Sequence, residues 1–302
     1  MTSSPASSQP LVSVLTPSFN QGRWLADNLR SVACQTYPNI EQIVMDGGSS
    51  DETLSLLESA GRHVSWRSEP DRGQSHALNK AFAQAEGDII GWLNSDDAYF
   101  RPDVLQTVVD CFVRYPEADV VYGHAALVNA DGLILQMIWV PKFSYGLLRL
   151  FNYMYQPAVF LRRSALDNTI VDESYDSFMD RELWLRLGRD HRFQRVNKVL
   201  AIDRHYPARK SNARPGLAAA EGARLAEVYG SPRGPWWSAQ RAAAKLLIRY
   251  LGVRALSQAG GHLAFDGAHD GYFKLLRRQL TMRRAAMPGV RDWQLHRERS
   301  AS

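Results

Sequence analysis

The sequence predicts an α/β protein whose central sheet is mostly parallel and flanked by helices. Short apolar, β-branched runs alternate with amphipathic segments of about a dozen residues, which is the pattern of repeated βαβ units. Three of the apolar runs end in polar turns, at residues 16–20, 46–51 and 94–97. Ligands of parallel sheets bind outside the carboxyl ends of the strands. We therefore expect these three turns to meet at one edge of the sheet.

The first part of the chain holds the regular alternation. Strands are predicted where apolar runs stop at polar, Pro or Gly residues: 11–19, 40–48, 63–70 and 88–94. Helices are predicted where apolar residues recur at helical spacing: 22–34, 51–59, 74–86 and 102–115. Strands joined through helices in this way pair in parallel.

The second part is less regular. Strands are predicted at residues 118–123 and 157–163, a hairpin turn at residues 129–132, and an amphipathic helix that begins at Asp180. From about residue 216 the pattern predicts helices only, rich in Ala and Arg. The chain thus divides into a disordered tail (1–10), an α/β domain (11–215) and a basic helical extension (216–302).

Composition narrows the class of protein. The 302 residues are 45% hydrophobic and 22% charged, which is ordinary for a globular protein with a sizeable core. Cys34 and Cys111 are far apart and belong to no Cys or His cluster, which excludes a disulfide framework and a zinc site. The N-terminus has no signal-peptide pattern, and no apolar run reaches the roughly 18 residues of a membrane span. These features predict a cytoplasmic protein.

Charge is distributed unevenly along the chain. Up to residue 203 there are 18 Lys and Arg against 25 Asp and Glu, a net charge of −7. From residue 204 there are 18 against 6, a net charge of +12. A basic final third predicts an anionic partner, with a membrane surface, a substrate diphosphate and nucleic acid as the candidates.

The acidic pair Asp96 and Asp97 follows an apolar strand through Asn94 and Ser95. Adjacent carboxylates repel unless they are solvated or neutralised, and a divalent cation bridging to a phosphate would neutralise them. The alternative is a solvated turn in which one Asp caps the next helix.

Four ordered segments resemble the glycosyltransferases of family 2, which have the Rossmann-like GT-A fold. They are VSVLTPSFN (12–20), IEQIVMDGGSSDET (40–53), EPDRGQSHALNKAFAQAEGDIIGWLNSDD (69–97) and FMDRELWLRLG (178–188). In that family these segments correspond to the nucleotide loop, the base-contacting loop, the approach to the D-x-D metal motif and the catalytic-base segment. The resemblance covers about residues 11–212.

The resemblance implies a role for each matching residue. Asp96 would bind Mg²⁺ or Mn²⁺, with Asp97 and His205 close by, and Asp180 would be the general base. Gly73 would lie in the loop beside the diphosphate or sugar, and Asn79 in the helix behind it. Nucleotide binding would fall to Thr16, Pro17, Asn20, Asp46, Asp51, Asp71, Arg72, Lys80 and Ser95.

The implied reaction is the transfer of one sugar from a nucleotide-diphosphate donor to an acceptor hydroxyl, with inversion at the anomeric carbon. The acceptor would be a saccharide or a lipid-linked saccharide in the synthesis of a cell-surface polysaccharide or glycolipid. The Q-x-x-R-W signature and membrane helices of the processive members are missing, which indicates single addition. Asn94 stands where the family has the first Asp of its motif, and its neutral amide is a weaker metal ligand.

Several of these residues also have structural interpretations. Asp46 could close an Asx turn with Gly47 and Gly48, and Asp180 could be an N-cap. His205 and Lys80 could be solvated surface charges. The function has alternatives as well, namely a catalytically weak nucleotide-sugar-binding protein and a nucleotidyltransferase of similar fold. Nucleic-acid binding is disfavoured because aromatic residues do not alternate with the basic ones.

Residues 235–256 and 272–284 combine basic and apolar side chains in helical patterns. In the first, Arg241, Lys245, Arg249 and Arg254 are spaced to share one broad face, with Trp236 and Trp237 at one end. This is typical of an interfacial helix on anionic lipid, so peripheral attachment at the inner face of the membrane is one interpretation. The other is that these helices pack against the catalytic domain and leave their arginines solvated.

Overall fold

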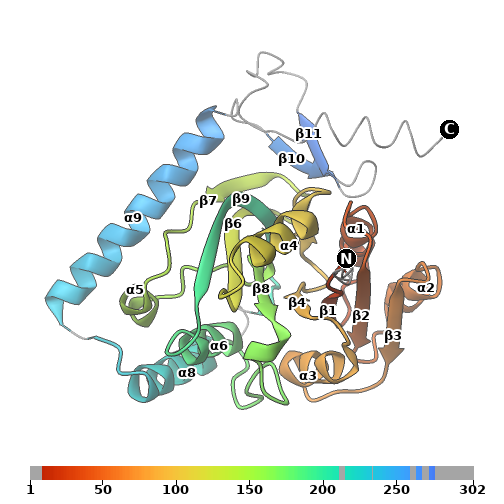
Figure 1. The fold of residues 1–302 in the computed structure, drawn as a ribbon, viewed down its shortest axis with the longest axis horizontal. Coiled ribbons are helices and arrows are strands. Elements are labelled where there is room, and N and C mark those ends of the chain that lie inside the picture. The colour runs from red at the N-terminus through yellow and green to blue at the C-terminus, as the bar shows by residue number, and fades with distance from the viewer. Residues whose placement is uncertain (1–8, 211–214, 233, 259–262, 267–271, 276–302) are drawn as a thin grey trace, which may run out of the picture.

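The computed structural model describes residues 9–210, 215–232, 234–258, 263–266 and 272–275. Its first part has the predicted alternation of strands and helices (Figure 1). The strands are β1 (Val12–Ser18), β2 (Ile40–Asp46), β3 (Val64–Ser68) and β4 (Ile89–Trp92). The helices between them are α1 (Gly22–Ala33), α2 (Thr53–Glu58) and α3 (Gln74–Gln84). β1 pairs in parallel with both β2 and β4, and β2 with β3.

The second part adds shorter helices and more strands. Its strands are β5 (Ala98–Tyr99), β6 (Val120–Val128), β7 (Ile134–Ile138), β8 (Val159–Arg162) and β9 (Phe193–Arg204). Its helices are α4 (Val104–Arg114), α5 (Tyr145–Leu150) and α6 (Met179–Leu187), with 3₁₀ turns at Gln156–Ala158 and Arg163–Ala165. The predicted turn at residues 129–132 joins β6 to β7, and Gly132 there has φ 83°.

Within the described residues these nine strands form one sheet, in the order β3-β2-β1-β4-β8-β6-β9-β5 with β7 paired to β6. The α/β fold is confirmed. The parallel pairing lies in the β3-β2-β1-β4 part, as predicted, and returns between β6 and β9. β8 and β7 run antiparallel to their neighbours, so the sheet as a whole is mixed.

Both faces of the sheet are covered by helices. Alternate residues of a strand point to opposite faces, and Val14 and Leu15 belong to two different apolar clusters. Leu15 packs in the cluster that includes α3 and α6, whereas Val14 packs in the cluster that includes α4. The larger cluster also takes in Leu225 and Tyr229, which lie beyond the predicted domain boundary at residue 215.

The C-terminal part differs from the prediction of helices only. It contains α8 (Pro215–Val228) and α9 (Pro235–Gln258), but also two antiparallel strands, β10 (Leu263–Asp266) and β11 (Tyr272–Leu275). The helix predicted over residues 272–284 is therefore wrong for its first four residues. The other nine lie outside the described residues, as do residues 1–8 of the predicted tail. No helix in the described ranges combines the length and the apolar character that crossing a bilayer requires.

The register of the sheet brings the polar strand ends together. Ser18 at the end of β1 lies opposite Asp46 at the end of β2. On the other side of β1, the Ser95 N–H donates to the Pro17 carbonyl at 3.4 Å. The three predicted turns therefore meet at one edge of the sheet, where a ligand of a parallel α/β sheet is expected.

Candidate active site

The loop after β1 has a backbone conformation fixed by its own side chains. Asn20 has φ 51°, in the left-handed region that Asn tolerates better than most residues. Its N–H donates to Ser49 Oγ at 2.7 Å, and its Oδ1 accepts from the Ser50 N–H at 2.9 Å. Thr16 is buried, and its Oγ1 accepts from Gln42 Nε2. Asn20 thus joins the first two strand-end loops, while Thr16 faces the interior.

Asp46 and Asp51 shape the second loop. The buried Asp46 carboxylate accepts hydrogen bonds from the N–H of Gly48 at 3.1 Å and from the N–H of Ser49 at 2.8 Å. Asp51 accepts from the N–H of Gly22 at 2.9 Å, at the start of α1. Burial raises the pKa of Asp51, but hydrogen bonds from Thr53 and Gly22 outweigh it and lower the pKa. These contacts favour the structural interpretation of Asp46, an Asx turn.

Asn94, at the end of β4, joins several elements through its amide group. Its Oδ1 accepts from Gln74 Nε2 and from Trp92 Nε1, both at 2.7 Å. Its Nδ2 donates to Gln156 Oε1 at 2.9 Å and to Asp97 Oδ2 at 3.3 Å. Asn94, which departs from the family motif, is therefore held by hydrogen bonds at both its amide oxygen and its amide nitrogen.

The acidic pair is buried at this edge. Asp96 Oδ2 accepts from the Tyr206 hydroxyl at 2.9 Å, and Asp97 Oδ1 accepts from the Arg204 N–H at 2.9 Å. Burial and the nearby charges of Asp96 and Asp203 raise the pKa of Asp97 well above its usual value, although Arg209 opposes this shift. Acidic groups are therefore concentrated at this edge.

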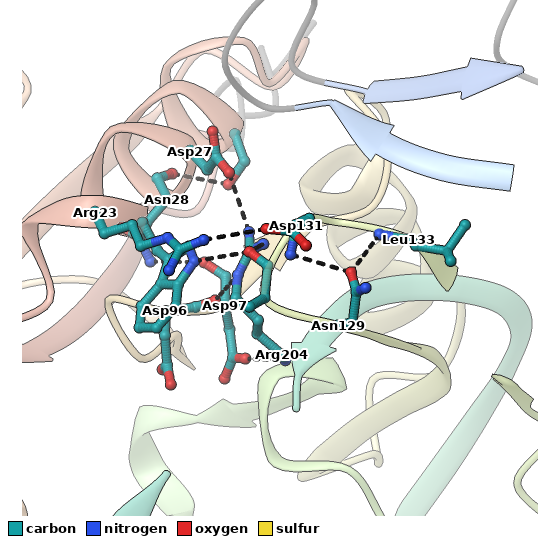
Figure 2. Close-up of polar contacts among 12 residues, drawn as sticks. Arg23, Asp27, Asn28, Asp96, Asp97, Asn129, Asp131, Leu133 and Arg204 are labelled. Atoms are coloured by element: carbon teal, nitrogen blue, oxygen red, sulfur yellow. Dashed lines mark hydrogen bonds and ion pairs between the residues drawn. The ribbon is translucent and has the colours of Figure 1, made fainter. Parts of the chain in front are cut away.

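Arg204, at the end of β9, contacts the acidic loop and Asp27 (Figure 2). Its buried guanidinium donates from Nε to the Asp96 carbonyl at 2.9 Å and pairs with Asp27 of α1 at 3.0 Å. It also donates to the Ala130 carbonyl in the β6–β7 turn at 3.2 Å. One side chain thus ties the β4 loop to α1 and to the hairpin.

Three residues near the acidic pair were missed by the sequence analysis. Asp203 is buried, pairs with Arg209 at 2.6 Å, and has a pKa raised by burial and by the charge of Asp96. Gln21 accepts from the Ser95 hydroxyl and donates to the Tyr206 hydroxyl at 3.0 Å. Asp203 and Tyr206 lie within two residues of the predicted His205, and this proximity in sequence is the signal that could have identified them.

A divalent cation fits this donor set in part. Mg²⁺ commonly takes one or two carboxylates and completes its shell with water and phosphate oxygens. Asp96 and Asp203 offer oxygen ligands, and the negative charge around them is what a dication would neutralise. His205 is exposed and close enough to lower the pKa of Asp203. In the part of the chain that the structure describes, no group of three or more His, Cys, Asp or Glu side chains is arranged to hold a metal ion.

The loop before α3 contains three predicted residues with different surroundings. Asp71 Oδ1 accepts from the N–H of Gly73, which has φ 113°. Arg72 is exposed and pairs with Glu173 at 2.7 Å. Lys80 is partly buried and pairs with Glu69. Asp71 thus braces the start of α3, and both basic side chains already pair with carboxylates.

Asn79, predicted to lie behind the diphosphate, is buried within α3. Its Nδ2 donates to the Val171 carbonyl at 3.0 Å, and its Oδ1 accepts from the N–H groups of Ile170 and Val171. Its contacts are therefore structural ones, which hold the segment after β8 against α3.

Asp180 lies in the first turn of α6 and is partly buried. Its Oδ2 accepts from Asn152 Nδ2 at 2.8 Å, and its Oδ1 accepts from the Arg181 N–H at 2.7 Å. Burial raises its pKa from 3.8 to about 6, against the opposing effect of these hydrogen bonds. The N-cap of α6 is Phe178, so the interpretation of Asp180 as a helix cap is wrong.

Arg209 relates Asp180 to the acidic pair. Its positive charge lowers the pKa of Asp180 and also that of Asp97, so it lies within electrostatic range of both. Arg209 therefore acts electrostatically on both Asp180 and the acidic strand end. The Rossmann-like sheet and this site together define the class: a glycosyltransferase of the GT-A fold.

Comparisons with known proteins specify the family. The model of glycosyl transferase family 2 matches residues 13–169, just over half of the chain. The chain belongs to this family. It is similar to an uncharacterized glycosyltransferase of Mycobacterium tuberculosis, with 41% identity over 105 residues. That match covers 34% of this chain and 40% of the relative, so the chain spans less than half of that protein's length.

Two solved structures share the fold. TarS (residues 1–349) of S. aureus, in complex with UDP-GlcNAc, matches with a TM-score of 0.58 and 20% identity, over 72% of this chain and 65% of TarS. The mannosyltransferase PcManGT of Pyrobaculum calidifontis, in complex with GDP-Man and Mn²⁺, matches with a TM-score of 0.53 and 19% identity. That match covers 84% of this chain and 77% of PcManGT. At these identities the likeness establishes the fold.

Proposed function

We propose that this protein transfers one sugar from a nucleotide-diphosphate donor to an acceptor hydroxyl, with inversion at the anomeric carbon. The observation that carries the proposal is Asp180, a carboxylate with a pKa of about 6 that shares the electrostatic influence of Arg209 with the acidic strand end. A general base works best when its pKa lies near the working pH. The sugar nucleotides bound by TarS and by PcManGT support a donor of this class.

The donor would lie across the strand ends of β1, β2 and β4. Asn20 presents the first loop, and Asp46 and Asp51 hold the second loop in shape. Asp96, with Asp203 and His205 beside it, would hold Mg²⁺ or Mn²⁺. The cation would supply positive charge to the leaving diphosphate.

Asp180 would take the proton of the acceptor hydroxyl as that oxygen attacks the anomeric carbon. Asn152 and the Arg181 N–H fix its two oxygens, so the carboxylate is oriented before the substrate arrives. Arg209, which pairs with Asp203 and acts electrostatically on Asp180, would stabilise the charge that develops on the diphosphate. One base without a protein nucleophile gives a single displacement, and inversion follows by the logic of inverting glycosidases.

The proposal is tested by nucleotide release from a panel of nucleotide sugars, with and without EDTA. Asp96→Ala and Asp180→Asn are compared with the wild type, and Asp167→Asn, whose side chain is 90% exposed, is the matched control. We expect metal-dependent release that Asp96→Ala abolishes and the control retains. A catalytically weak binding protein would bind nucleotide sugars without releasing nucleotide. A nucleotidyltransferase would instead form nucleotide sugar from a sugar phosphate.

We also propose that α9 attaches the protein to anionic lipid at the inner face of the membrane, where a lipid-linked saccharide would be the acceptor. Trp236, Leu246 and Tyr250 are 68%, 68% and 60% exposed. Ile248 instead packs against the core, and Lys245 lies over the Phe151 ring at 5.5 Å. The helix thus packs against the protein along one side and exposes other apolar side chains to solvent. This arrangement differs from the predicted separation of basic and apolar residues onto two faces.

A further inference from the structure

A cavity of about 220 Å³ lies between α5, α6, α8 and α9. Its volume is several times the roughly 30 Å³ that one water molecule occupies. Among the described residues it is lined by the side chains of Arg149, Arg181 and Arg241, together with Trp237, Ser231 and Ser238. We call it the arginine pocket. No aspartate or glutamate lines it within the described ranges.

The arginine pocket concentrates positive charge among the described residues. No ion pair joins Arg149, Arg181 or Arg241 to a carboxylate in the described part of the chain. Burial lowers the pKa of Arg181, Asp180 opposes this, and Arg241 lowers the pKa further by repulsion. Guanidinium groups this close repel one another unless an anion lies between them.

Two of the three arginines are held in place by backbone groups. Arg181 donates from Nη2 to the Arg149 carbonyl at 3.0 Å and to the Leu148 carbonyl at 3.3 Å. Arg149 donates to the Gly230 carbonyl. The Nε atoms of both arginines are buried without a hydrogen-bond partner. A buried donor without a partner is unfavourable, and a ligand oxygen would satisfy it.

The arginine pocket adjoins the candidate base at the start of α6. Arg181 follows Asp180 directly in α6, and the two side chains interact electrostatically. The residues that line the pocket include none of the strand-end residues assigned to the donor. An anion bound here would therefore accompany the acceptor, while the donor diphosphate lies at Asp96.

We propose that the arginine pocket binds a phosphate group of the acceptor, so that the acceptor is a phosphorylated or diphosphate-linked saccharide. This inference rests on the proposed function, because it specifies the acceptor of that reaction. Arginine forks match phosphate oxygens in a bidentate way, and Ser231 and Ser238 add hydroxyl donors. Trp237 supplies an apolar wall for the group that carries the phosphate.

The test measures binding of inorganic pyrophosphate and of farnesyl diphosphate to the whole protein by calorimetry, in EDTA. Arg241 is exposed and lies at the rim, so Arg241→Gln removes a charge without breaking one of the backbone contacts above. Arg249→Gln, on the same helix and away from the pocket lining, is the matched control. We expect pyrophosphate to bind at least about tenfold more weakly to Arg241→Gln, the size of one charge-assisted contact, with little change in Arg249→Gln or Asp96→Ala.

The two probes distinguish the source of the phosphate. Tighter binding of farnesyl diphosphate than of pyrophosphate, with the same loss in Arg241→Gln, indicates a lipid-linked acceptor. Equal binding indicates a soluble phosphorylated saccharide. No measurable binding to the wild type, or equal binding to Arg241→Gln and Arg249→Gln, would overturn the proposal. If the wild type fails this binding test but releases nucleotide, the phosphate pocket is overturned and the proposed function stands. If the wild type binds pyrophosphate but releases no nucleotide, the pocket stands and the proposed function is overturned.

Discussion

Asn94 shows what an amide contributes at the position that corresponds to the first Asp of the D-x-D motif. Its oxygen accepts from Gln74 and Trp92, and its amide nitrogen donates to Gln156 and Asp97. An aspartate would keep the two accepted bonds but lose both donated ones. It would also place a further negative charge beside Asp97, whose pKa is already raised. The amide therefore supports the loop without adding a negative charge beside Asp97.

At the same scale, we expect Asp180→Asn to lower turnover by about 10²–10⁴-fold, because an amide cannot take the proton of the acceptor hydroxyl. The wild-type kcat/KM should rise with pH through about 6, where the Asp180 carboxyl loses its proton. Steady-state rates measured between about pH 5 and 8 give both results.

The same variant has an opposite effect on stability. The pKa of Asp180 is raised from 3.8 to about 6 on folding, so its stabilising contribution is present below 3.8 and is lost as pH rises through 6. Relative to the wild type, Asp180→Asn should gain roughly 1–3 kcal/mol in free energy of unfolding between about pH 4.5 and 8, measured in urea. A flat rate profile, or a mutant with most of its turnover and no gain at pH 8, would refute the role of Asp180 as base.

The sequence identified the residues that follow strand ends, since a strand's apolar run stops visibly at Asp46 or Asn94. It did not identify the contacts that define their roles. Asp46 accepts hydrogen bonds within its own loop. Asp96 accepts from Tyr206, and Ser95 donates to Gln21, both from distant parts of the chain. Such partners depend on how β9 and α1 meet, which no local pattern encodes.

At the scale of elements, α8 completes the start of α6. Glu221 is buried, and its carboxylate accepts from the N–H groups of Asp176, Ser177 and Phe178 at 2.8, 2.8 and 3.0 Å. These N–H groups belong to the segment that leads into α6 and ends at its N-cap, Phe178, and a buried N–H group needs such an acceptor. The predicted boundary at residue 215 thus separates two elements that depend on each other.

We expect Glu221→Ala to lower the free energy of unfolding by about 1–3 kcal/mol, because it leaves partly buried N–H groups without an acceptor. Glu227→Ala, an exposed change on the same helix, is the control and should shift it by less than about 0.5 kcal/mol. Urea unfolding at neutral pH measures both. Equal stability of the two variants would mean that the cap contributes nothing.

Helices and strands were predictable where the periodicity of apolar residues was strong. They were missed where the apolar pattern was interrupted by polar residues or too short to repeat. The four parallel strands and their helices stood out because buried strands alternate with amphipathic helices. β9 was missed because its first half is partly exposed and polar, with Asn197 and Lys198, and only its second half is buried. α5 has six residues, which is too short for a helical period to appear.

At the scale of the whole molecule, α9 exposes apolar side chains in the part of the chain that carries most of the net positive charge. Figure 1 shows α9 running along one side of the molecule. Leu246, Leu247 and Tyr250 are exposed there, and Arg249 lies among them. Exposed apolar side chains beside positive charge suit the boundary of an anionic bilayer.

We expect the whole protein to sediment with anionic vesicles at low salt, and the triple change of Leu246, Leu247 and Tyr250 to Ser to lower the vesicle partition coefficient roughly 100-fold. Each apolar side chain removed costs on the order of 1 kcal/mol of burial in the interface. Neutral vesicles and the Arg249→Gln variant separate the apolar from the charged contribution. If the triple variant sediments like the wild type, α9 is not the attachment surface.

The contacts of Arg204 with the β4 loop, α1 and the β6–β7 turn also constrain the order in which the protein folds during synthesis. The bond from Arg204 to the Asp96 carbonyl spans 108 residues, and the family-matched segment ends at residue 169. A ribosome releases the β4 loop long before the strand that fixes it, and contacts of such long sequence separation form late and slowly. The nascent N-terminal half can form its parallel sheet, but its acidic loop acquires the final geometry only after residue 204 has left the exit tunnel.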